Sequence, residues 1–89
     1  MYKVILNKKV IKFLQRRSES EKKSIKRKID LLEQNPIKNE NQDIKQLKGV
    51  ENVYRLLIGK IRLVYQVLNE KLVVILFSAG MRGDIYKHK

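Results

Sequence analysis

Apolar residues recur along this chain with two different periods, and the change between them separates a helical half from a strand half. The segment Tyr2–Leu6 is short, apolar and rich in β-branched residues, which predicts a strand. From Lys8 the spacing becomes helical, because Val10 is followed three and four positions later by Phe13 and Leu14. We therefore expect a strand and then an amphipathic helix.

A second helix is expected to begin at Ser18. The segment Ser18–Glu21 has the form of a capping box, in which a serine and a glutamate three residues later cap the first turn. The helix should end before Asn35-Pro36, since the residue preceding a proline avoids the helical region. Its apolar positions form one stripe, made of Ile25, Ile29 and Leu32. The two helices are expected to form an αα-hairpin with a basic outer side.

The remainder of the chain is expected to be a meander of strands. Residues 37–46 are polar and predict a surface loop, and after Gly49 the apolar period becomes two. Gly59-Lys60 suits a type II′ hairpin turn, and Asn69-Glu70 is a weaker second turn. Strands are expected at about residues 53–58, 61–68 and 71–77, with a short fourth near Ile85. The order β-α-α-β-β-β(β) predicts an α+β fold, with the two-helix hairpin packed on one face of a small antiparallel sheet.

The Gly59-Lys60 turn determines which side chains share a face of that sheet. It pairs Leu57 with Arg62 and Arg55 with Val64, so the two arginines become diagonal neighbours on one face. A register slip of one residue would move both arginines into the core. The opposite face, expected to meet the helices, carries Tyr54, Leu56, Ile58, Ile61, Leu63, Tyr65 and Val67.

Composition adds a charge and removes several classes of site. The 89 residues, taken as one domain spanning 1–89, carry a net charge of +12, which favours a polyanionic partner. Without cysteine there is no disulfide or thiolate metal site, and the single histidine, His88, cannot form a metal site alone. No apolar run approaches the ~18 residues that span a bilayer, and no signal peptide is recognisable, so we expect a cytoplasmic protein without a membrane partner.

Four residues are candidates for chemistry. Arg55 and Arg62, with no acidic residue nearby in the sequence, are suited to clamp a phosphate; alternatively each is solvated or bound to a loop carboxylate. Arg82 and Tyr86 follow the third strand of the meander, in a tail expected to return to the sheet. Positive charge near a tyrosine hydroxyl favours its ionised form, so Tyr86 is a candidate for proton transfer or base stacking. Its alternative role is an aromatic anchor for the C-terminus.

Several motifs, in this order and at these spacings, resemble the RelE/ParE superfamily of toxin–antitoxin toxins, on its RelE side. The resemblance covers nearly the whole chain. It rests on Leu47-Lys48-Gly49, Tyr54-Arg55-Leu56, Ile61-Arg62-Leu63-Val64-Tyr65-Gln66-Val67 and Gly80-Met81-Arg82-Gly83-Asp84-Ile85-Tyr86.

The resemblance implies a small toxin that enters the ribosomal A site and cleaves mRNA without a metal or other cofactor. A cognate antitoxin protein would neutralise it, and the free toxin is expected to be monomeric. Arg62 and Arg82 match the family's catalytic-site arginines, and Tyr86 matches its C-terminal tyrosine. Arg55 stands where the founding members carry a basic residue. Contact with RNA is expected from Lys48 and Lys45.

Two departures from the family pattern keep other functions open. Leu57 stands where a second basic residue is expected, and Met81 stands where many relatives have histidine, so the general base is not defined. One alternative is a ParE-like toxin that inhibits DNA gyrase by binding. The other is a non-catalytic RNA- or partner-binding protein with the same fold.

Overall fold

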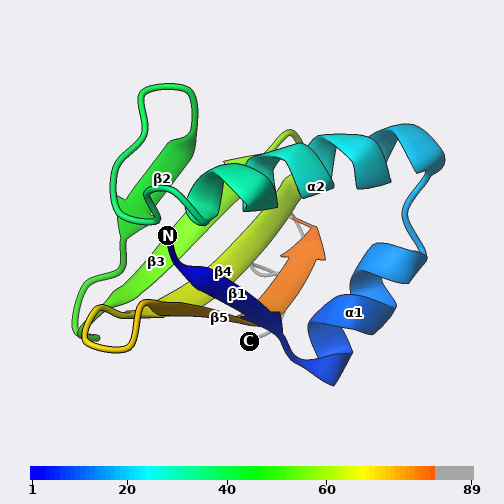
Figure 1. The fold of residues 1–89 in the computed structure, drawn as a ribbon. Helices are drawn as coiled ribbons and strands as arrows, with labels where there is room; N and C mark the ends of the chain where they lie inside the picture. Colours follow the sequence, from blue (N-terminus) through cyan, green and yellow to red (C-terminus); the bar gives the residue numbers. More distant parts are fainter. Residues whose placement is uncertain (82–89) are drawn as a thin grey trace.

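The computed structural model describes residues 1–81, which form two helices on one face of a five-stranded sheet (Figure 1). The strands lie side by side in the order β1-β5-β4-β3-β2. Along the chain the elements are β1 (Lys3–Leu6), α1 (Lys8–Gln15), α2 (Glu19–Leu32), β2 (Asp43–Gln46), β3 (Val53–Ile58), β4 (Ile61–Leu68) and β5 (Val73–Met81). The expected α+β class, with a two-helix unit on one face of the sheet, is confirmed.

Both helices begin with side-chain caps. The Asn7 side chain accepts from the Val10 N–H at 2.9 Å, and the Ser18 hydroxyl accepts from the Glu21 N–H at 3.2 Å. The Glu21 carboxylate in turn accepts from the Ser18 N–H at 3.0 Å, which completes the predicted capping box. That backbone hydrogen bond is the main cause that lowers the pKa of Glu21 below its usual value.

The β3–β4 hairpin has the predicted register. Leu57 pairs with Arg62 and Arg55 with Val64. Gly59 has a φ of 59°, whereas Lys60 is not among the residues with positive φ, as a type II′ turn requires. The face toward the helices carries every residue expected there, and all of them are buried: Tyr54, Leu56, Ile58, Ile61, Leu63, Tyr65 and Val67.

Tyr65 is the largest side chain at the centre of the core. Its ring stacks on Tyr54 with centroids 5.9 Å apart. Its hydroxyl donates a 2.6 Å hydrogen bond to the carbonyl of Pro36, in the loop between α2 and β2. Burial, followed by the neighbouring Tyr54, raises the pKa of Tyr65 far above its ordinary value. The core therefore holds the loop that leads into β2.

Two expectations about the sheet are wrong in detail. Residues 37–46 are not entirely loop, because Asp43–Gln46 form the edge strand β2 on β3. The sheet is also mixed, because β1 runs parallel to β5 and pairs Lys3 with Val73. The first error arises because Ile44 is the only apolar residue of β2, which leaves no apolar alternation to detect.

The last hairpin also differs from the simple meander. Residues 69–72 form the connection, with Leu72 at a φ of 53°, so the turn is longer than Asn69-Glu70. Strand β5 continues to Met81, beyond the expected end at residue 77. A β-bulge interrupts it, since Tyr65 pairs with Leu76 while Val64 pairs with Ser78. The strand expected near Ile85 lies outside the described residues.

Candidate functional site

The candidate site lies on the open face of the sheet, which we define as the face turned away from α1 and α2. Strand pairing assigns its members, because residues directly opposite one another in a ladder share a face. Arg55 and Arg62 lie on it as predicted, in rows contributed by β3 and β4. Asp43 and Lys45 of β2 join them, opposite Leu57 and Arg55 respectively. The open face is therefore basic over β2, β3 and β4.

Arg62 lies beside a position that has no side chain. Its partner on β5 is Gly80, and a Cβ built on Gly80 would meet nothing within 4 Å. Arg62 is half-buried, and its Nε is buried without a hydrogen-bond partner in the described chain. No ion pair to Arg62 forms within residues 1–81. A buried guanidinium nitrogen with its donor unused is suited to bind an anion.

Arg55 has an acidic partner, Asp43, which agrees with the alternative that an arginine of this face is bound to a carboxylate distant in the sequence. Its Nη2 lies 2.9 Å from Oδ1 of Asp43, an ion pair in which the side chains are 19% and 63% exposed. The sequence did not identify Asp43 as this carboxylate, because Asp43 belongs to the edge strand β2, which was expected to be loop. Such a partly exposed pair contributes up to about 1 kcal/mol. Arg55 is therefore fixed in place and partly neutralised.

The two candidate lysines lie at different places relative to Arg62. Lys45 is exposed on the open face, directly opposite Arg55. Lys48 lies in the exposed connection between β2 and β3, whose residues Gln46–Glu51 surround a crevice of about 450 Å³. That connection leads into the start of β3, whereas Arg62 pairs with Leu57, near the end of β3. The structure thus brings Lys45, Arg55 and Arg62 together and leaves Lys48 at the far end.

Arg82 and Tyr86 lie outside the described residues. The last described residue, Met81, pairs with Ile61, one position before Arg62 in β4. The end of β5 is thus next to Arg62.

Arg17 is an additional arginine near this end of β5 that sequence reasoning did not single out. Its Nη1 donates to Sδ of Met81 at 3.3 Å, and its guanidinium lies 4.5 Å from the centre of the Phe13 ring. Its Nε, like those of Arg55 and Arg62, is a buried donor without a partner in the part of the chain described. The only available signal was a position just after the first helix, which does not distinguish Arg17 from Arg16.

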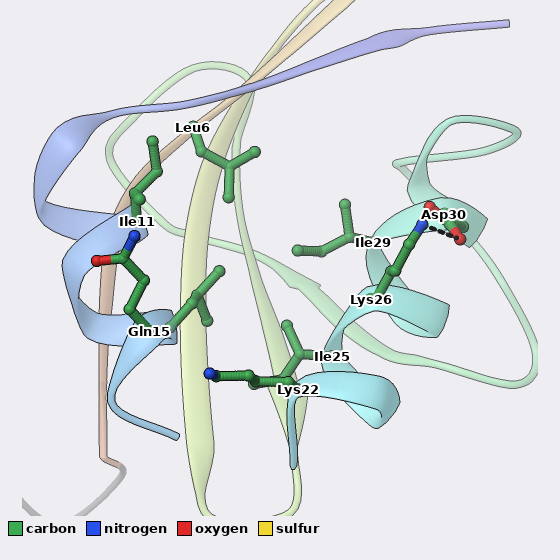
Figure 2. Close-up of a pocket in the computed structure, with 9 residues that line it drawn as sticks. Leu6, Ile11, Gln15, Lys22, Ile25, Lys26, Ile29 and Asp30 are labelled. Carbon is green, nitrogen blue, oxygen red and sulfur yellow. Dashed lines mark hydrogen bonds and ion pairs between the residues drawn. The ribbon is translucent and has the colours of Figure 1, made fainter. Parts of the chain in front are cut away.

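A separate apolar groove of about 440 Å³ lies on the other side of the sheet, between α1 and α2 (Figure 2). It exists because the helices diverge, α1 packing on β5 and α2 on β3. Lys22 reaches from α2 toward α1 across it, with its Nζ 3.5 Å from the exposed Glu19 carboxylate, and Lys26 is engaged with Asp30 at 3.3 Å. Its apolar lining is formed by Leu6, Ile11, Leu14, Ile25 and Ile29. The groove does not include the arginines of the open face.

Two kinds of feature are absent from the first 81 residues. No cluster of three or more His, Cys, Asp or Glu residues is placed there to hold a metal ion. In the same part of the chain, no helix has the length and hydropathy needed to cross a membrane.

With this geometry in place, comparison with known proteins identifies relatives along the whole described fold. A family model described as the ParE toxin of type II toxin-antitoxin system, parDE, matches residues 4–82. A Methanocaldococcus jannaschii protein, named as a candidate toxin RelE1, is 39% identical over 87 residues, which cover 98% of this chain and 97% of that relative.

Solved structures of RelE proteins have the same fold. In the archaeal RelE-RelB complex from Pyrococcus horikoshii OT3, one chain matches with a TM-score of 0.83 and 28% identity, covering 92% of this chain and 96% of that one. The isolated E. coli RelE toxin matches with a TM-score of 0.76 and 25% identity, over 98% and 93% of the two chains. Together, the family match and the 39% identical relative show that this chain belongs to the ParE toxin family of type II toxin–antitoxin systems, within the RelE/ParE superfamily.

Proposed function

We propose that this toxin is a ribosome-dependent mRNA endoribonuclease that inhibits translation without a metal ion. The observation that carries the proposal is Arg62, a half-buried arginine beside Gly80 with an unused Nε donor and no acidic partner among the described residues. Lys45 and Arg55 extend the positive surface on the same face. A net charge of +12 adds a long-range attraction for RNA.

The proposed reaction is an attack of a ribose 2′-oxygen on the adjacent phosphorus. The 2′-O–P bond forms while the P–O5′ bond breaks, so the products are a 2′,3′-cyclic phosphate and a 5′-hydroxyl. One proton leaves the 2′-hydroxyl and one is delivered to O5′. The phosphorane-like transition state has more negative charge than the starting phosphate, so fixed guanidinium groups stabilise it preferentially.

Each candidate residue has a role in this proposal. Arg62 and Arg82 are the clamps on the transition state, and Tyr86 transfers a proton. Arg55 is an auxiliary clamp, because its ion pair with Asp43 must loosen before it can engage a phosphate fully. Lys45 on the open face and Lys48 in the β2–β3 connection bind the RNA backbone.

The proposal also includes the cellular context. A single domain of residues 1–89 would act as a monomer in the cytoplasm, where the ribosomal A site holds the mRNA for in-line attack. Free RNA lacks that orientation, which gives a physical reason for dependence on the ribosome. The relatives from Pyrococcus horikoshii OT3 and Methanococcus jannaschii were each solved with RelB, and by analogy we propose that a cognate antitoxin neutralises this toxin.

We propose the groove between α1 and α2 as a docking site for a segment of that antitoxin. Its lining is apolar, and Lys22 lies across it, which suits an apolar segment that carries an acidic residue. Ile11→Glu should weaken binding of the antitoxin, expected as the product of an adjacent reading frame. Ile37→Glu is the matched control, because both isoleucines are 41% exposed but only Ile11 lines the groove. Equal antitoxin affinity of the two variants would contradict this assignment.

The test of the proposed activity is induction of the toxin in a host, with growth and mRNA 5′ ends followed together. The wild-type chain should arrest growth and produce new ends inside translated codons. Arg62→Ala should relieve both effects, while Arg27→Ala, an exposed arginine on α2, should relieve neither. Circular dichroism checks that both variants are folded. If Arg62→Ala cleaves mRNA as fast as the wild type, the catalytic assignment is wrong.

Gyrase inhibition is the second candidate, because the matching family model is that of ParE. It predicts growth arrest with no new mRNA ends and with loss of supercoiling activity by purified gyrase. A non-catalytic protein would instead bind ribosomes or RNA without arresting growth. The same induction experiment therefore separates all three functions.

A further inference from the structure

Phe77 is the extra residue of the β-bulge in β5, so it lies outside the regular pairing of β5 with β4. Leu76 pairs with Tyr65 and Ser78 with Val64, so Phe77 has no partner residue on β4. The alternation from buried Leu76 turns the Phe77 side chain to the open face, and it is 40% exposed. Bulges commonly redirect a side chain toward a functional surface.

Asn7, which follows β1 on the other side of β5 from β4, holds the backbone of the bulge. The side-chain amide of Asn7 donates to the carbonyl of Phe77 at 2.9 Å. The backbone N–H of Asn7 donates to the carbonyl of Leu76 at 3.1 Å. The same Asn7 caps α1, so the backbone that carries the Phe77 ring is tied to the first turn of that helix. Because this backbone is already held, less conformational freedom is lost when a ligand stacks on the ring that it carries.

A lone exposed phenylalanine is ordinary, and the position of Phe77 relative to Arg62 makes this one informative. Gly80 is the partner of Arg62, and Phe77 lies three residues earlier on the same strand. That separation corresponds to about 10 Å along the strand. The open-face residues of β5 between them are small, Ser78 and Gly80, so no large side chain of β5 separates the ring from the guanidinium.

We propose that Phe77 is a stacking platform for a base of single-stranded RNA whose phosphate is held at Arg62. The RNA ligand rests on the proposed function; the arrangement of a flat ring beside an unpaired cation rests on the contacts above. Stacking on an aromatic ring accepts any base, because every base has a π-face. Phe77 therefore contributes affinity and positions the RNA strand, without selecting a sequence.

The first experiment uses Phe77→Trp as a reporter, since the chain contains no tryptophan. The full-length variant is titrated at low salt with a short single-stranded RNA, and then with the same sugar-phosphate chain lacking all of its bases. We expect the tryptophan emission to be quenched by the intact RNA and not by the chain without bases. Ile11→Trp is the control, because Ile11 is 41% exposed but belongs to α1 on the other side of the sheet.

The second experiment measures RNA affinity by anisotropy. Phe77→Leu should weaken binding by about 5-fold to 150-fold, the range expected for loss of one stacked base, whereas Phe77→Tyr should bind like the wild type. Unquenched tryptophan emission of Phe77→Trp on bound RNA, or equal affinity of Phe77→Leu, overturns the inference. Failure of the wild-type chain to bind the RNA overturns it as well. If Phe77→Leu weakens only antitoxin binding, the ring belongs to a protein interface instead.

A cleavage assay on programmed ribosomes separates this inference from the proposed function. If the wild type does not cleave mRNA but base-dependent quenching is observed, the endoribonuclease proposal fails and the stacking platform stands. If the wild type cleaves, and Phe77→Leu binds RNA and cleaves at the same rate, the stacking platform fails and the activity stands.

Discussion

The buried hydroxyl of Tyr65 offers a direct test of how the loop before β2 is held. It donates at 2.6 Å to the carbonyl of Pro36, and both residues are buried. Tyr65→Phe removes the donor and leaves that carbonyl unpaired in the core, which costs about 1–3 kcal/mol. We expect the free energy of unfolding at neutral pH, measured by urea denaturation, to fall by an amount in this range.

The same hydroxyl makes stability depend on alkaline pH. Because the pKa of Tyr65 is raised in the folded chain, its contribution is fully present below the unfolded pKa, about 10. That contribution is lost as the pH rises from there toward the folded pKa. The wild type should therefore lose about 1.4 kcal/mol per pH unit from this group above about pH 10. Tyr65→Phe should lack this part of the slope.

Tyr54→Phe is the matched control, since Tyr54 stacks on Tyr65 but donates no hydrogen bond within the described residues. It should change stability less than Tyr65→Phe and keep most of the alkaline slope. Equal unfolding free energies for the wild type and Tyr65→Phe, or equal slopes above about pH 10, would refute the reasoning.

Three further predictions concern the open face and the helix cap. Asp43→Asn should release Arg55 and steepen the dependence of log K on log salt by about 0.7 for single-stranded RNA; an unchanged slope would mean that Arg55 does not reach phosphate. Gly80→Ala should change the free energy of unfolding, measured by urea titration, by less than about 0.5 kcal/mol. Gly80→Leu should stay folded but cover Arg62, and anisotropy titration should show weaker RNA binding. Ser18→Ala should destabilise α2 by about 1 kcal/mol. Since the pKa of Glu21 is lowered, the cap's contribution should also be lost on acidification through that folded pKa, visible as a smaller acid sensitivity of Ser18→Ala.

Local patterns predicted the parts of the fold that depend on local chemistry. The capping box at Ser18 and the Gly59-Lys60 turn each involve only neighbouring residues, and both are present. The turn then sets the register, so the position of one glycine was enough to predict that Arg55 and Arg62 share a face. Where a short turn fixes which residues pair, the two-residue alternation of a strand is enough to assign each side chain to a face of the sheet.

The features that sequence reasoning missed depend on contacts between distant segments. Strand β2 has one apolar residue, Ile44, and forms because β3 provides hydrogen-bond partners for its backbone. Missing β2 concealed the pairing of Asp43 with Arg55. The sequence does not reveal the bulge at Phe77, because the residues on both sides of it keep the two-residue alternation of a regular strand. For the candidate site, the faces of Arg55 and Arg62 were predictable, whereas the contacts of their guanidinium groups were not.

The parallel pairing of β1 with β5 determines when this toxin can fold. Lys3 pairs with Val73, so the first strand made has no partner until β5, the last described strand, has been synthesised. Both helices likewise pack on strands that follow them in the chain. Long-range pairing of this kind delays folding until the whole ladder is available. While the chain is still emerging, the sheet that displays Arg62 and Gly80 is incomplete, so a nascent copy cannot yet form the proposed phosphate site.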